Sequence, residues 1–118
     1  MKYVDGFVIP LPKKNLAAYR RMARTAAIVW REYGALDYKE CVGDDLNQPF
    51  GMPFPTLTKL KKGETVVFSY IVYKSRAHRD RVNKKVMKDP RIAASCDPKT
   101  APFDLRRMVY GGFSVIVD

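Results

Sequence analysis

The sequence is poor in the residues that metal and redox sites use. It holds one histidine, His78, and two cysteines among 118 residues. Cys41 and Cys96 lack the Cys-x-x-Cys spacing of zinc and redox motifs, and neither has a neighbouring histidine. We therefore expect two free, buried thiols and no metal. Phosphate-binding loops, nucleophile elbows and dinucleotide glycine patterns are also missing, so we expect no cofactor.

Long apolar runs are missing as well. No stretch approaches the roughly 20 apolar residues that a membrane helix needs. Asp5 stands where a signal peptide would carry its apolar segment. We expect a cytoplasmic protein without a membrane partner, folded as a single domain over residues 1–118.

Acidic residues are scarce beside basic ones, with 12 Asp and Glu against 22 Lys and Arg and a net charge of +10. This balance favours anionic partners. Seven of the cations fall in residues 76–91, where pairs such as Asp80 with Lys84 are also typical of a solvated helix. A nucleic-acid surface on this helix is the alternative, but charge without a groove-reading motif is weak evidence for it.

The run from Glu64 to Ser75 is the clearest structural signal. It is apolar on both alternating faces and predicts a central strand covered on both sides. Further alternating patterns predict strands over residues 2–10, 35–42 and 107–117, with Gly111 and Gly112 marking a bulge or a close approach in the last. Helical patterns cover 15–33, capped by Asn15 and ended by Gly34, and 76–89, capped by Ser75, with a short extra turn from Pro90 to Cys96.

These elements follow one another in the order β-α-β-β-α-β. This order predicts an α+β fold, a ferredoxin-like sandwich with an antiparallel sheet and both helices on one face. The long segment 43–63, with one helical turn expected at residues 56–60, is predicted to be a functional lid or a partner-binding arm.

The other face of the sheet would be open. If the smaller side chains of Val4, Gly6, Val8, Val67, Ile71 and Phe113 pack under the alanine-rich helix, an apolar face with two carboxylates is left uncovered. A patch of this extent is rarely left in water, so we expect either a second copy of the chain or stacked nucleic-acid bases to cover it. The face would carry Tyr3, Phe7, Phe68, Tyr70, Met108 and Tyr110 together with Asp5, Tyr38 and Glu40.

Nucleic-acid stacking is the weaker of these two interpretations. An RNA-recognition motif has stacking rings at the entry to its third strand, where this chain reads Lys62-Gly63-Glu64-Thr65-Val66. Two carboxylates on the same face would also repel phosphates. We therefore do not expect RNA binding through the sheet.

Blocks along the whole chain resemble a known family. The opening YVDGFVIPLPKKNLAAYRRMA, the turn GALDYKECVGDD, the block FSYIVYKSRAHRDRVNKKVMKDPR and the closing RMVYGGF are similar to the YbaA-like bacterial proteins, a family of domains of unknown function. The resemblance implies the dimeric α+β barrel superfamily, in which two ferredoxin-like sheets pair face to face and each subunit has a cavity. That superfamily includes cofactor-free monooxygenases, muconolactone isomerases and haem enzymes, so the resemblance implies a homodimer but no particular reaction.

Three residues are candidate acid or base groups. An unperturbed imidazole titrates near neutral pH, so His78 is a candidate general base at the mouth of the cavity, or else a packed imidazole bonded to a loop carbonyl. Asp5 and Glu40 are predicted on the barrel face, where burial would raise the pKa of a carboxyl and suit it to proton abstraction. The alternative for both is an ion pair with Arg or Lys across the dimer.

Apolar and aromatic residues complete the candidate site. Their rings suit a planar aromatic or anionic small molecule, although core packing is the ordinary role of such residues. The leading hypothesis is thus a small-molecule binder or cofactor-independent enzyme, and the alternatives are a non-catalytic regulatory dimer and a nucleic-acid binder. The candidate ligand-binding residues are Phe7, Trp30, Tyr38, Phe68, Tyr70, Met108 and Tyr110.

Overall fold

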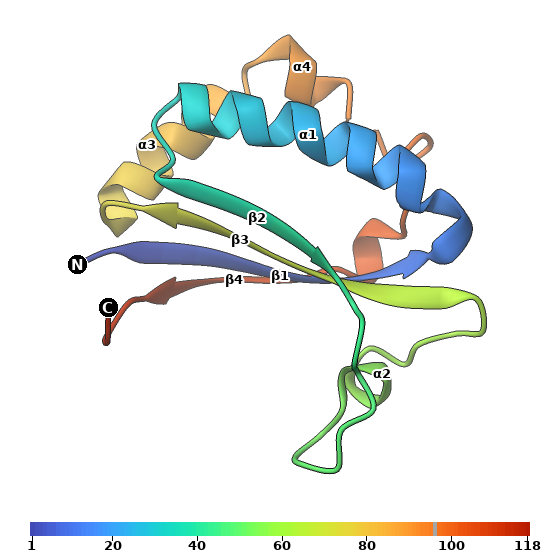
Figure 1. Cartoon of the computed structure of the whole chain (residues 1–118). Helices are drawn as coiled ribbons and strands as arrows, with labels where there is room; N and C mark the ends of the chain where they lie inside the picture. The colour runs from blue at the N-terminus through green and yellow to red at the C-terminus, as the bar shows by residue number, and fades with distance from the viewer. Residues whose placement is uncertain (96) are drawn as a thin grey trace.

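A computed structural model describes residues 1–95 and 97–118. Three helices, α1 (Leu16–Glu32), α3 (Arg76–Val86) and the short α4 (Pro90–Ala93), lie over one face of a curved sheet (Figure 1). The single turn α2 (Phe54–Leu57) lies on the other side, in the segment that joins two strands (Figure 1). Among the residues described, no helix is long and apolar enough to cross a membrane.

The sheet has four antiparallel strands in the order β2-β3-β1-β4. This is the ferredoxin-like arrangement that the order of elements predicts. The strand β3, predicted to be central, pairs with both of its neighbours. The strands are β1 (Tyr3–Pro12), β2 (Asp37–Val42), β3 (Glu64–Tyr73) and β4 (Val109–Ser114), with 3-10 turns at Lys13–Asn15 and Leu105–Arg107.

The first strand runs past the proline expected to end it. Pro10 lies opposite Val66 in the β1–β3 ladder. The carbonyl of Val66 accepts a hydrogen bond from the Gly43 amide, on the β2 side of β3. The missing amide of Pro10 therefore leaves no acceptor on Val66 unpaired. A proline is tolerated at such a position because the amide it lacks would point away from the paired strand.

Two of the expected helix signals are confirmed and one is not. Ser75 caps α3, its hydroxyl accepting a hydrogen bond from the His78 amide at 3.0 Å. Gly34 ends α1 with a φ of 117°, in the region that favours glycine. Asn15 forms no cap; its side-chain amide instead donates to the Pro102 carbonyl at 2.8 Å and ties the start of α1 to the last loop.

The predicted bulge in the last strand is absent, and the atoms that come close to Gly112 belong to the Tyr3 side chain, not to backbone or ligand as predicted. Gly6 pairs with Gly111 and Asp5 with Gly112 in unbroken register. A Cβ atom on Gly112 would collide with the Tyr3 hydroxyl, so the strand needs glycine there. The helical turn of the long segment also lies two to three residues earlier than expected, at Phe54–Leu57.

The prediction of which sheet residues face the helices was wrong for β1, β2 and β4. Tyr3, Asp5 and Ile9 are buried under the helices, while Val4, Gly6 and Val8 lie on the open face. The alanines of α1 leave space that large side chains of the sheet fill, because facing layers pack large against small. Tyr38, Glu40 and Tyr110 therefore lie on the helix face and Phe113 on the open face, the reverse of the prediction. The prediction for β3 is confirmed: Phe68 and Tyr70 lie on the open face, and Val67 and Ile71 on the helix face.

Candidate functional site

Glu40 is the most unusual carboxylate of the helix face. It points from the edge strand β2 toward α1, where the Tyr19 hydroxyl donates to its Oε1 and the Tyr38 hydroxyl to its Oε2, each at 2.7 Å. No lysine or arginine of the described residues forms an ion pair with it. Burial raises the pKa of Glu40, and hydrogen bonds from Tyr19, Tyr38 and Ser69 only partly oppose that shift.

The Glu40 carboxyl lies where two hollows meet. One, which we call the inner cavity, lies between α1 and the sheet and has a volume of about 240 Å³. The other, which we call the outer groove, runs between α1 and β2 and has a similar volume of about 240 Å³. Tyr19, Tyr38 and Glu40 line both, so this trio lies at the junction of the two hollows.

The inner cavity is mostly apolar, with the Glu40 trio as its polar end. Phe7, Trp30, Tyr38 and Met108 of the predicted ligand-binding residues line it. Ser69 adds a hydroxyl from β3. The remaining lining residues are Ile9, Tyr19, Met22, Ala26, Glu40, Ile71, Ile92, Ser95, Phe103 and Leu105.

Asp5 has a different environment. It is 1% exposed, and its Oδ1 accepts from the Arg79 guanidinium at 2.7 Å. Asn83 and Tyr73 donate to its Oδ2 at 3.3 and 3.4 Å. Asp5 is thus ion-paired, as the alternative interpretation predicted, but its partner Arg79 comes from α3 of the same chain and not from a second copy.

The Asp5 pair belongs to a wider network that holds α3 and α1 on the sheet. The Trp30 indole donates to Tyr73 Oη at 3.1 Å and to Asn83 Oδ1 at 3.0 Å, and Arg79 also donates to the Tyr110 hydroxyl at 3.1 Å. In the part of the chain that the structure describes, no buried side-chain polar atom lacks a partner. A carboxylate whose charge is balanced by a buried guanidinium, as that of Asp5 is by Arg79, is suited to structure rather than to proton transfer.

His78 does not line either hollow. Its Nδ1 accepts a hydrogen bond from the Lys74 amide at 3.0 Å, and its ring packs edge-on against Tyr73. Burial, with smaller contributions from Lys74 and Arg81, lowers the pKa of His78 and favours the neutral imidazole. The imidazole is packed, as in the second interpretation, but its bond is to a backbone amide and not to the predicted carbonyl.

Apart from His78, the predicted candidates therefore separate into three places. Glu40, Tyr38, Phe7, Trp30 and Met108 meet at the inner cavity. Asp5 and Tyr110 belong to the ion-paired network around Arg79, and Phe68 and Tyr70 lie on the open face of the sheet.

Sequence reasoning missed two residues of the site. Tyr19 falls among the buried alanines of α1 and reads as a core residue, although a hydroxyl in such a place needs a polar partner. Ser69 is the one small polar residue in the run Val66 to Val72, and at that position it signals a polar group beneath the helix.

Two further expectations concern thiols and cations. Cys41 is exposed, not buried as predicted, because it lies on the open face of the edge strand β2, opposite Phe68. Cys96 lies outside the described residues. Of the basic residues of 76–91, Arg79 is committed to Asp5 and Arg91 to Asp89 and Glu32. Among residues 1–95 and 97–118, no three His, Cys, Asp or Glu side chains are grouped so as to hold a metal ion.

Comparisons with known proteins agree with this picture of the fold. The family described as "Protein of unknown function (DUF1428)" matches residues 2–105. The chain is 44% identical over 118 residues to "Uncharacterized protein YbaA" of Escherichia coli K12, covering 100% of this chain and 99% of that protein, and the match to YbaA of Shigella flexneri has the same values.

Two solved structures share the fold at low sequence identity. Rv0793 from Mycobacterium tuberculosis superposes with a TM-score of 0.59 at 12% identity, covering 100% of this chain and 98% of that one. An uncharacterized NIPSNAP domain protein from Burkholderia xenovorans superposes with a TM-score of 0.56 at 11% identity, covering 96% and 93%.

Proposed function

The chain belongs to the DUF1428 family, to which no activity is assigned, and from its inner cavity we propose that it is a cofactor-independent acid/base enzyme acting on a small planar compound. Glu40 would be the general base. Proton abstraction of this kind is the first step both of an isomerase and of a cofactor-free monooxygenase.

One observation carries this proposal: the Glu40 carboxyl faces a cavity without a compensating cation. A structural carboxylate in such a place is normally paired, as Asp5 is with Arg79. The raised pKa of Glu40 brings it closer to the pH at which a general base is effective. Tyr19 and Tyr38 hold its two oxygens in place at 2.7 Å.

The tyrosines also suit the product of proton abstraction. Burial, followed by the charge and hydrogen bond of Glu40, raises the pKa of both hydroxyls, which therefore stay protonated donors. When Glu40 accepts a proton it needs fewer donated hydrogens. One hydroxyl can then turn toward an enolate or phenolate oxygen and stabilise the charge that develops there.

The size of the inner cavity limits the ligand. Its volume is about 240 Å³, whereas an apolar cavity of about 150 Å³ holds benzene. A single ring with a short substituent therefore fits.

Proton exchange in D₂O tests the proposal. We expect the protein to accelerate C–H exchange in single-ring compounds with an enolisable carbon, starting with phenylacetone and phenylpyruvate, as followed by proton NMR. Glu40→Gln should lower the rate about 10²- to 10⁴-fold, the usual contribution of a general base. Glu32→Gln, an exposed glutamate outside both hollows, is the matched control. Equal rates for wild type and Glu40→Gln would contradict the proposal.

The pH dependence follows from the shifted pKa of Glu40. Only the ionised carboxylate can take a proton, and burial raises its pKa above the ordinary value of 4.5. The exchange rate should therefore rise with pH through a midpoint above that value and then level off. A midpoint at or below the ordinary glutamate value, measured as kcat/KM between pH 4 and pH 9, would show that a different group limits the reaction.

A non-catalytic role is the alternative, and the same protein samples distinguish it. A ligand that quenches the fluorescence of Trp30, the only tryptophan, without any proton exchange would identify a binding or regulatory protein. In that case the Glu40 trio would serve recognition alone.

We also propose that the protein is a homodimer formed through the open faces of two sheets. Phe68 and Phe113 are 45% and 61% exposed, and they flank a shallow hollow of about 560 Å³. Its floor is the pair Gly6 and Gly111, and Val4, Val8, Tyr70 and Val109 surround it. An apolar surface with a hollow beside projecting rings can receive the same surface of a second copy by two-fold symmetry.

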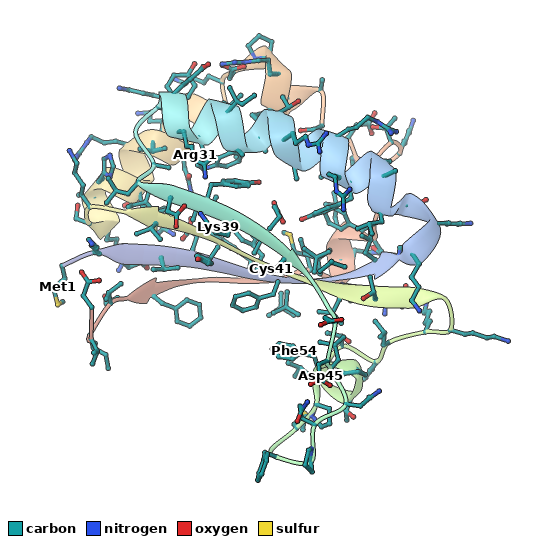
Figure 2. All side chains as sticks on the ribbon, viewed as in Figure 1. Met1, Arg31, Lys39, Cys41, Asp45 and Phe54 are labelled. Carbon is teal, nitrogen blue, oxygen red and sulfur yellow. The ribbon has the colours of Figure 1, made fainter. Side chains whose placement is uncertain are left out.

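The segment 43–63 would act as the arm of this dimer. This segment projects from the open face of the sheet, on the side opposite α1 (Figure 1), and Figure 2 shows Phe54 within the projecting segment. Phe54 packs edge-on against Phe68, with ring centroids 6.5 Å apart. Beyond it Phe50 and Met52 are 85% and 67% exposed. These side chains lie where a second copy would cover them, whereas a lid would have to lie over the helix side.

We place the protein in the cytoplasm, as the sequence predicts. The exposed thiol of Cys41 supports a reducing compartment, because free surface thiols oxidise readily elsewhere.

We do not include nucleic-acid binding in the proposal, since two of the predicted surface cations, Arg79 and Arg91, are held in ion pairs.

A further inference from the structure

The outer groove has a charge that the inner cavity lacks. Arg20 and Arg24 line it from α1, directly beside the Glu40 trio. They are exposed and, in the described part of the chain, neither forms an ion pair. Arg31, near the end of the same helix, differs: it is bound to Asp37 and to the Tyr38 carbonyl.

The two arginines are one helical turn apart, so their charges repel. A like-charged pair at this spacing destabilises a helix. The nearest carboxylate lining the groove, Glu40, is engaged by two tyrosines and reaches neither guanidinium. The groove thus presents two uncompensated guanidinium groups, whose planar forks bind carboxylates well.

The order of the groups determines where each part of a ligand would lie. The two arginines line only the outer groove, Glu40 and its tyrosines line both hollows, and Phe7 and Trp30 line only the inner cavity, so the base lies between the cations and the apolar rings. We propose that the substrate is a carboxylate whose acidic C–H lies between the carboxylate and an apolar ring, the class of 2-oxo acids with an aryl side chain. This inference rests on the proposed function and specifies the substrate of the same site.

The reaction of such a compound balances without a co-reactant. Glu40 takes a proton from C3, the C–H electron pair forms the C2–C3 double bond, and the carbonyl π pair moves onto oxygen. A tyrosine hydroxyl donates to that oxygen, and return of the proton from Glu40 to the oxygen gives the enol. The step is a keto–enol tautomerisation, with neither oxidation nor reduction.

Calorimetric titration with phenylpyruvate and with its uncharged methyl ester tests the inference. The two probes share the ring and the enolisable carbon and differ in charge. We expect the wild type to bind the acid at least about tenfold more tightly, the effect of one charge-assisted hydrogen bond. Arg20→Gln/Arg24→Gln should remove this preference and leave the affinity for the ester unchanged.

Arg21→Gln is the matched control, because Arg21 is exposed on the same helix but lines neither hollow. We expect Arg21→Gln to keep the preference. Equal binding of acid and ester by the wild type would overturn this inference alone, and so would an equal loss in Arg21→Gln, which would indicate a general effect of net charge. Failure of the wild type to bind either probe would overturn the proposed function as well.

Discussion

Asp5→Ala is expected to destabilise the protein by about 3–5 kcal/mol, the usual cost of removing one partner of a buried ion pair. Asp5 is 1% exposed and the Arg79 side chain 14% exposed, so water cannot replace the lost carboxylate. Asn83 and Tyr73 also lose an acceptor at that position. For a domain of this size the loss is a fall in melting temperature of roughly 10–25 °C, measurable by calorimetry or circular dichroism.

The surface pair between Lys2 and Asp118 supplies the control. Lys2 Nζ and Asp118 Oδ2 are 3.0 Å apart, but the Lys2 side chain is 48% exposed and the Asp118 side chain 70% exposed. Asp118→Ala should therefore change stability by less than about 1 kcal/mol. A loss equally small for Asp5→Ala would mean that the buried network does not anchor α3.

A double variant distinguishes the loss of a contact from the burial of an unpaired charge. Replacing both partners, as Asp5→Leu with Arg79→Met, should recover part of the stability lost in Asp5→Ala. Buried pairs often contribute little net stability compared with apolar residues of similar size, whereas a lone buried charge is costly. No recovery would assign the loss to the other hydrogen bonds of the network.

Phe68→Lys is expected to convert a dimer into a monomer. Phe68 lies on the inner strand β3, in a row with Val8 of β1 and Val109 of β4. A lysine there would be buried against the second copy without an acceptor, and two-fold symmetry would place it twice in the interface. The cost of an unpaired buried charge implies a dissociation constant raised by at least about a hundredfold, which analytical ultracentrifugation at micromolar concentration would detect.

Ile28→Lys introduces the same charge at a different surface. Ile28 is 55% exposed on α1, on the helix side of the molecule and away from the open face. We expect this variant to remain dimeric. A wild-type monomer at micromolar concentration, or a dimer that persists in both Phe68→Lys and Phe113→Lys, would contradict pairing through the open face.

The candidate site could be predicted from the sequence only in part. Glu40, Tyr38, Phe7, Trp30 and Met108 were named as candidates and do meet at one cavity. The sequence alone does not distinguish Asp5 from Glu40 as a candidate base, because both are acids in alternating strands. What separates them is Arg79, seventy-four positions away in the chain from Asp5, whose side chain reaches one carboxylate and not the other.

The order of the elements, the central place of β3, the end of α1 and the start of α3 follow from local signals in the sequence: alternation, a left-handed glycine and a capping serine. Which face of β1 is buried depends on tertiary packing. Tyr3, Asp5 and Phe7 alternate with Val4, Gly6 and Val8, and neither set is plainly polar, so alternation alone leaves two choices. Packing decides between them, because the alanines of α1 accept large side chains and leave the small ones outside.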